Sequence, residues 1–218
     1  RDPHERVRNF YKLAIPLIEA YMSYCTNKSY LDFNDMITKT ISLFKNRREI
    51  AEKYREKFKH ILVDEFQDVN NLQVELLKLL LTPDNTLFCV GDDWQSIYGF
   101  RGSNVDYIVN FQDHFKDAEI VKLSMNYRST EHIVGASNEV IRQNKIKIDK
   151  EVRSNKKSER KIHVFAGKEA AENIQYVIEE IKKLFKKGYA TEDILFLYRR
   201  SKMYAPYQKA LRRHRLRV

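Results

Sequence analysis

Hydrophobic and polar positions follow two alternating periods along the chain. Apolar residues recur at helical spacing over 5–25 and 35–58, whereas short apolar runs at 60–66 and 86–91 predict buried strands. The alternation continues with predicted helices over 72–80, 105–115, 130–144, 170–187 and from 203, and predicted strands over 119–123, 162–165 and 193–198. Strands that alternate with helices are typical of an α/β fold in which helices cover a parallel sheet.

A basic segment interrupts this alternation, so we expect the boundary between two α/β units between Leu123 and Lys161. Residues 145–161 carry a net charge of +5 and residues 199–218 a net charge of +8, within a total of +10. The first stretch has the composition of an exposed linker, whereas the second fits a nucleic-acid surface or an interrupted domain. A pI near 9.4 favours a polyanionic partner.

Composition excludes several classes of protein. Mean hydropathy is −0.60, and no apolar run approaches the roughly 20 residues of a membrane span. The charged start has no signal peptide, and Cys25 and Cys89 support neither a disulfide framework nor a cysteine zinc site. We therefore expect a cytoplasmic setting without membrane partners. The chain has 6 glycines where about fifteen are usual, and no G-x-x-x-x-G-K-[ST] phosphate loop, which argues against a complete nucleoside triphosphatase.

Two adjacent carboxylates, Asp64 and Glu65, lie at the carboxyl end of the predicted strand at 60–66. At the carboxyl end of a parallel strand, one carboxylate can hold hydrated Mg²⁺ while the next orients and polarises an attacking water. An acidic turn after a strand is the plainer interpretation. The strand before the pair and the sequence Gln67-Asp68 after it favour the interpretation as a magnesium and catalytic-base site.

The segment VGDDWQSIYGFRGS, residues 90–103, gathers an amide, three aromatic residues, an arginine and three glycines at the end of the next strand. Aromatic faces near a cation are typical of sites that stack single-stranded bases. Trp94, Tyr98 and Phe100 can each instead belong to a core, but their clustering with Gln95 and Arg101 favours binding.

A third segment, LSMNYRS at 123–129, places Arg128 after a predicted strand end. An arginine there can stabilise transition-state charge on a γ-phosphate, although this signal alone is weak.

Taken in order, LDFNDMI (31–37), ILVDEFQD (61–68), VGDDWQSIYGFRG and LSMNYRST resemble successive motifs of the UvrD/Rep family of superfamily-one DNA helicases, and the GDDW spelling resembles the helicase IV branch. The resemblance implies a RecA-like P-loop NTPase fold, a parallel sheet with helices on both faces, in parts of two lobes. It divides the chain into a leading helical segment (1–30), the end of the first lobe with the Walker B acids (31–125) and the start of the second (126–218).

The resemblance also implies roles for single residues. Asp64 would bind Mg²⁺, and Glu65 would be the catalytic base. Gln95 would contact the γ-phosphate of ATP, Tyr127 would stack near the adenine, and Arg128 would be the arginine finger. The remaining implied contacts are those of single-stranded DNA with Tyr98, Phe100 and Arg101. The family couples ATP hydrolysis to 3′ to 5′ stepping and to the unwinding of duplex DNA in repair or recombination.

The chain departs from the family pattern because the phosphate loop is absent and the later motifs would lie beyond Val218. We therefore expect an internal fragment with negligible ATPase activity of its own. Two alternatives stay open: the motor part of a RecB/AddA-type helicase-nuclease, and a nucleic-acid-binding module that does not hydrolyse ATP. Replacement of Glu65 by Gln distinguishes a motor from a binding module. The sequence does not indicate an oligomeric state.

Overall fold

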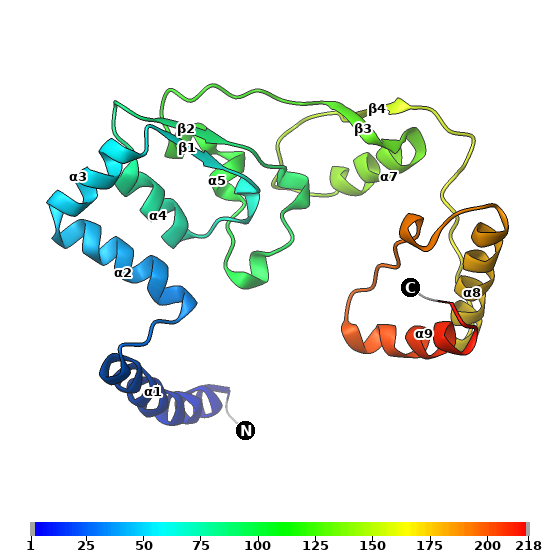
Figure 1. Cartoon of the computed structure of the whole chain (residues 1–218), viewed down its shortest axis with the longest axis horizontal. Coiled ribbons are helices and arrows are strands. Elements are labelled where there is room, and N and C mark those ends of the chain that lie inside the picture. The colour runs from blue at the N-terminus through cyan, green and yellow to red at the C-terminus, as the bar shows by residue number, and fades with distance from the viewer. Residues whose placement is uncertain (1–2, 217–218) are drawn as a thin grey trace. The chain divides into compact units, whose positions relative to one another are not determined.

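The chain forms two compact units in a computed structural model that describes residues 3–216 (Figure 1). The first unit takes in residues up to 126 together with 135–153, and the second takes in 127–134 and the residues from 154 onward. β3 (Met125–Thr130) and α7 (Glu131–Arg142) therefore contribute residues to both units. The expected division into a leading segment and parts of two motor lobes stays a prediction.

Three helices open the first unit: α1 (Pro3–Lys28), α2 (Phe33–Asn46) and α3 (Arg48–Lys57). α2 begins at a capping box, in which the Asp35 N–H donates to Asp32 Oδ1 at 2.8 Å. The single helix predicted over 35–58 is wrong, because the backbone leaves the helical region at Arg47 (φ −129°, ψ 83°). This bend brings the rings of Phe44 and Tyr54 within 5.6 Å of each other, whereas ten residues of straight helix would separate them by about 15 Å.

A two-stranded parallel sheet lies at the centre of the first unit and consists of β1 (His60–Val63) and β2 (Thr86–Cys89). The register pairs His60 with Thr86 and Val63 with Cys89. The connection between the strands contains α4 (Asn71–Leu80), the kind of crossover that parallel strands require. Figure 1 shows the two strands side by side, so their carboxyl ends meet at one edge of the sheet. The predicted strands and their parallel arrangement are confirmed here.

The core beside this edge is built around the fully buried Phe66. Its ring meets the Phe111 ring edge-on at 5.3 Å. The helix predicted over 105–115 is instead two short helices, α5 (Asp106–Val109) and α6 (Phe111–His114). Asn110 ends α5, because its backbone turns (φ −107°, ψ 42°) and its side-chain amide donates to Asp106 Oδ1 at 2.7 Å.

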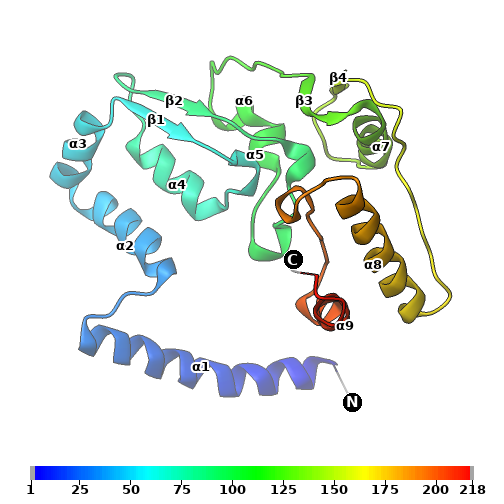
Figure 2. The same cartoon turned by 45° about the vertical axis from the view of Figure 1, so that its right-hand side comes forward.

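The second unit has its own core between α8 (Ala170–Lys186) and α9 (Ser201–Arg213), which is seen nearly end-on beside α8 in Figure 2. Ile178 and Ile181 of α8 pack with Leu211 of α9, and all three are buried. Gly188 follows Lys187, the C-cap residue of α8, and its φ of +87° is the left-handed conformation that favours glycine after a helix.

Three predicted strands are wrong within the described residues: 119–123, 162–165 and 193–198 form no strand. The side chains there are mostly exposed, as at Leu123 (83%), Val164 (90%) and Leu195 (81%). An apolar segment becomes a strand only where a neighbouring strand satisfies its N–H and C=O groups. These segments have residue types that favour strands, but the part of the chain that the structure describes gives them no neighbouring strand to pair with.

A second sheet forms instead between β3 and β4 (Arg153–Lys156). β4 lies inside the segment that the sequence predicted to be an exposed linker. Because β3 begins at Met125, Arg128 lies within a strand and does not follow a strand end as predicted. In this strand Arg128 O accepts a hydrogen bond from Lys156 Nζ at 3.2 Å.

Both cysteines are free thiols. Burial raises the pKa of the Cys89 thiol to about 12. Across residues 3–216, no helix is both long enough and apolar enough to cross a bilayer.

Candidate functional site

Backbone hydrogen bonds join the two chain segments just beyond the carboxyl ends of β1 and β2. The Phe66 N–H donates to Val90 O at 2.9 Å, and the Val90 N–H donates to Val63 O at 2.8 Å. These bonds extend the parallel pairing past both strands. The adjacent carboxylates Asp64 and Glu65 are consequently held beside the loop that follows β2.

Glu65 has a left-handed backbone (φ 50°, ψ 42°), and its N–H donates to Asp64 Oδ1 at 2.9 Å. A residue other than glycine in this conformation costs about 1 kcal/mol, and such strain is concentrated at functional sites. Both side chains are exposed. The two acids therefore lie, exposed to solvent, at the carboxyl end of β1, the position that the sequence predicted.

The buried amide of Gln67 links the two strand ends. Gln67 is only 1% exposed. Its Nε2 donates a hydrogen bond to Glu65 Oε2 at 2.6 Å, and its Oε1 accepts one from the Asp92 N–H at 2.9 Å. One side chain thus fixes the Glu65 carboxylate relative to the loop after β2. In the sequence, Gln67 supports the chemical interpretation of the two acids, but nothing there predicts this bridge.

Gly91 makes the close approach of these segments possible. A Cβ at this position would lie 2.6 Å from Ile108 Cδ1, 2.8 Å from Gln67 Oε1 and 3.1 Å from the Phe66 nitrogen. The two shorter distances mean that a larger residue would have to displace the Ile108 side chain and the hydrogen-bonded Gln67 amide, so glycine suits this close approach.

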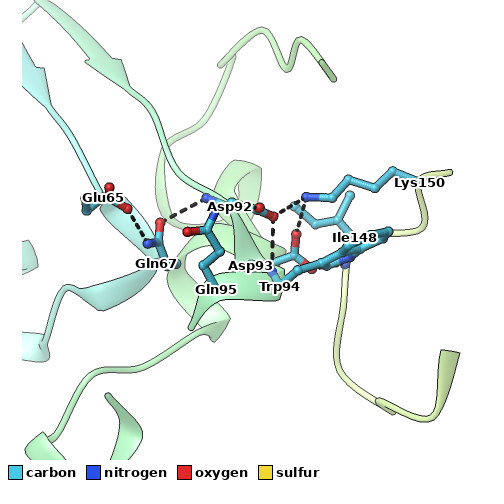
Figure 3. Close-up of polar contacts among 8 residues, drawn as sticks. All are labelled: Glu65, Gln67, Asp92, Asp93, Trp94, Gln95, Ile148 and Lys150. Carbon is cyan, nitrogen blue, oxygen red and sulfur yellow. Dashed lines mark hydrogen bonds and ion pairs between the residues drawn. The ribbon is translucent and has the colours of Figure 1, made fainter. Parts of the chain in front are cut away.

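The loop after β2 then turns tightly from Asp92 to Gln95, and we call these four residues, together with the preceding Gly91, the GDDWQ turn (Figure 3). Asp92 Oδ1 accepts the Trp94 N–H at 3.2 Å, and Oδ2 accepts Gln95 Nε2 at 2.9 Å. Glu65 and Gln95, two of the predicted catalytic residues, are therefore connected through Gln67 and Asp92. We call this series of hydrogen-bonded side chains, Glu65, Gln67, Asp92 and Gln95, the polar chain; it runs across the carboxyl ends of both strands.

Lys150 lies at the other end of this series of polar contacts. Its ammonium lies 2.7 Å from Asp92 Oδ1 and 2.8 Å from Asp93 Oδ1, and 5.0 Å from the centre of the Trp94 ring. The Ile148 N–H adds a 2.7 Å hydrogen bond to Asp93 Oδ2. Nothing in the sequence singles out Lys150, because one lysine within a basic stretch carries no signal of its partner.

Burial and charge compete at this ion pair. Burial alone would raise the pKa of Asp92, but hydrogen bonds from Lys150 and Gln95 outweigh it and hold the pKa below its ordinary value. Burial likewise would lower the pKa of Lys150, but the hydrogen bonds that its ammonium donates to Asp92 and Asp93 raise the pKa instead. Both groups are thus held in their charged forms around neutral pH.

Asp64 is the predicted Mg²⁺ ligand. Across residues 3–216, no three His, Cys, Asp or Glu side chains are grouped to hold a metal. Mg²⁺ commonly takes one or two protein carboxylates and completes its shell with water and phosphate oxygens. The exposed Asp64 carboxylate suits that mode, because Oδ1 accepts the Glu65 N–H and Oδ2 can face a cation.

The predicted DNA-binding residues lie together just after the GDDWQ turn. The rings of Tyr98 and Phe100 are 6.1 Å apart, and the Arg101 guanidinium lies 5.0 Å and 5.5 Å from their centres. Phe100 is 80% exposed and Tyr98 38%. An exposed aromatic pair beside a cation suits base stacking and does not belong to the core. Trp94, in contrast, is half-buried against Lys150.

Tyr127 and Arg128 lie in the second unit, in β3. Both side chains are exposed, Tyr127 at 67%. The structure brings together the predicted residues of the first unit, whereas the roles of Tyr127 and Arg128 toward a nucleotide stay predictions.

Comparison with known proteins gives matches over nearly the whole chain. The family model for the UvrD/REP helicase N-terminal domain matches residues 2–116, and that for the UvrD-like helicase C-terminal domain matches residues 121–218. A "Probable DNA helicase II homolog" of Mycoplasma capricolum is 36% identical over 214 residues, which are 96% of this chain and 30% of that protein. An "ATP-dependent DNA helicase PcrA" of Staphylococcus aureus is 36% identical over 188 residues, 86% of this chain and 26% of that protein.

Proposed function

The chain belongs to the UvrD/Rep helicase family, and on this premise we propose that it is part of an ATP-driven helicase that moves 3′ to 5′ on single-stranded DNA and unwinds duplexes in repair or recombination. The observation that carries the proposal is the polar chain across the strand ends. It connects Glu65 to Gln95 through Gln67 and Asp92. A triphosphate bound at this edge would meet a base and an amide already held in place.

Glu65 acts as the base in this proposal. Gln67 Nε2 donates to its carboxylate and leaves Glu65 Oε1 to take a proton from the attacking water. Asp64 is the residue that would hold Mg²⁺, which when bound neutralises charge on the phosphate oxygens. Positioning of the water and stabilisation of charge are the main contributions a protein makes to phosphoryl transfer.

We assign Gln95 and Arg128 contacts with the γ-phosphate of ATP, and we assign Tyr127 a contact with the adenine, as the family motifs imply. Gln95 is exposed on the turn and is held by Asp92. Hydrolysis removes the γ-phosphate that Gln95 contacts. The GDDWQ turn therefore responds to the state of the nucleotide.

The DNA contacts follow three residues after Gln95. Stacking of bases on Tyr98 and Phe100, with Arg101 beside them, would hold a single strand without reading its sequence. A displacement of the turn on hydrolysis is passed directly along the chain to these residues. As a result, the helicase would grip and release DNA in step with ATP hydrolysis.

The chain spans 26–30% of the length of the curated relatives it matches. Its 218 residues contain no G-x-x-x-x-G-K-[ST] loop, which in P-loop enzymes cradles the β- and γ-phosphates. We therefore propose that this chain alone hydrolyses ATP negligibly. We also propose a cytoplasmic location, in keeping with free thiols at Cys25 and Cys89 and with a DNA substrate.

The test uses the longer helicase that contains this chain. ATP hydrolysis is measured with and without single-stranded DNA, and strand separation is measured on duplexes with a 3′ or a 5′ tail. We expect DNA-stimulated hydrolysis and ATP-dependent separation of the 3′-tailed duplex. Separation without ATP, or none at all, contradicts the proposal; preference for the 5′ tail overturns the direction; degradation of the strands indicates a helicase-nuclease.

A further inference from the structure

Lys150 ties a distant segment to the GDDWQ turn. It lies in the connection between α7 and β4, and its ammonium contacts both carboxylates of the turn, at 2.7 Å and 2.8 Å. Its side chain is 14% exposed and that of Asp93 is 1% exposed. Figure 3 shows the lysine reaching the turn from the connection, on the side opposite Glu65.

We propose that Lys150 is a positioning residue for ATP hydrolysis, which sets Gln95 and Glu65 by fixing the carboxylate of Asp92. The inference rests on the proposed function. Asp92 divides its contacts: Oδ1 accepts from Lys150, Oδ2 accepts from Gln95, and its N–H donates to Gln67. Lys150 thus acts through Asp92 and touches none of the reacting groups.

Charge explains why the lysine is needed for this geometry. Asp92 and Asp93 are adjacent acids whose Oδ1 atoms both face the ammonium. Without the cation the two carboxylates repel each other, and Asp92 turns away. Rotation of Asp92 releases the Gln95 amide on one side. Movement of its backbone loosens the Gln67 bridge to Glu65 on the other.

Stability alone does not account for the arrangement. Replacing a buried ion pair with apolar residues is often neutral or stabilising, so such a pair is weak evidence of a purely structural role. Here one ammonium also lies over the Trp94 ring at 5.0 Å, and the neighbouring Ile148 N–H fixes the second carboxylate. These contacts define one orientation of the turn.

The kinetic test compares Lys150→Met, Lys150→Arg and the control Lys145→Met in the longer helicase. Lys145 is an exposed lysine of the same connection. We expect Lys150→Met to lower kcat by about tenfold to a hundredfold, with KM for ATP within about threefold, because misplaced groups slow the chemical step. Lys150→Arg restores most of kcat, and Lys145→Met leaves it unchanged.

The spectroscopic test uses Trp94, the single tryptophan of the 218-residue chain. Lys150→Met is expected to change its fluorescence emission in the folded chain, whereas Lys145→Met is not. If Lys150→Met fails to fold, the double variant Asp93→Asn/Lys150→Met removes the buried charge together with its partner and takes its place in both tests.

A lower melting temperature with unchanged kcat overturns the inference, because the lysine is then structural. Equal loss of kcat in Lys145→Met also overturns it. A wild-type helicase without ATPase activity refutes the proposed function and with it the positioning role. An active wild type with an unaffected Lys150→Met refutes the positioning role alone.

Discussion

Replacement of Gly91 by alanine tests the close packing that joins the two strand ends. The added Cβ would lie 2.6 Å from Ile108 Cδ1 and 2.8 Å from Gln67 Oε1. Overpacking of this kind costs about 1–3 kcal/mol, and loss of the hydrogen bond from the Asp92 N–H to Gln67 adds about 1 kcal/mol. We expect the free energy of unfolding to fall by about 3 kcal/mol.

Gly135→Ala is the matched control, since it makes the same chemical change in the same unit. Gly135 lies inside α7, and nothing lies within 4 Å of an added Cβ. Alanine is favoured over glycine in a helix interior, so this variant should be more stable by about 0.5–1 kcal/mol.

Urea titrations of both variants and the wild type give the free energies, with Trp94 fluorescence reporting on the first unit. Opposite signs for the two changes support the packing argument. Equal stability of Gly91→Ala and the wild type would show that the strand ends are not closely packed.

Three further predictions concern charge, stacking and thiol chemistry. Burial opposes ionisation of Asp92 but the Lys150 hydrogen bond prevails, so the pair stabilises the fold above about pH 4 and is lost as the pH falls below it. The stability difference between wild type and Lys150→Met should shrink from pH 7 to pH 3, and a constant difference contradicts this. Phe100→Ala should weaken binding of single-stranded DNA to the longer helicase by about 1–3 kcal/mol in a fluorescence anisotropy titration, unlike the exposed Phe10→Ala; equal effects refute the stacking role. Burial raises the pKa of Cys89 to about 12, so at pH 8 it should react slowly with a thiol reagent until the chain unfolds; rapid reaction in the folded chain contradicts it.

Sequence patterns predicted the parts of the site that lie next to each other in the chain. The acids at 64 and 65 follow a short apolar run that does form β1. The aromatic residues near Arg101 in the sequence do lie against its guanidinium. Each of these features depends on local spacing. The parallel pairing of β1 and β2 also followed, because an intervening helix forces a crossover.

The sequence did not predict contacts between distant segments. Lys150 meets Asp92 across 58 residues, and Gln67 meets the Asp92 N–H across 25. Apolar runs at 162–165 and 193–198 predicted strands, yet a strand requires a neighbour that the pattern cannot specify. Local propensity identifies segments, whereas pairing depends on tertiary contacts.

Glu65, held by Gln67 at the end of β1, is the residue that we propose as the base for ATP hydrolysis in the helicase that contains this chain. The most direct measurement is kcat for ATP in the presence of single-stranded DNA, for wild type and Glu65→Gln. A general base contributes about 10²–10⁴ in rate. We expect kcat to fall at least about a hundredfold while ATP and DNA still bind with unchanged affinity. If Glu65→Gln turns over ATP as fast as the wild type, Glu65 is not the base.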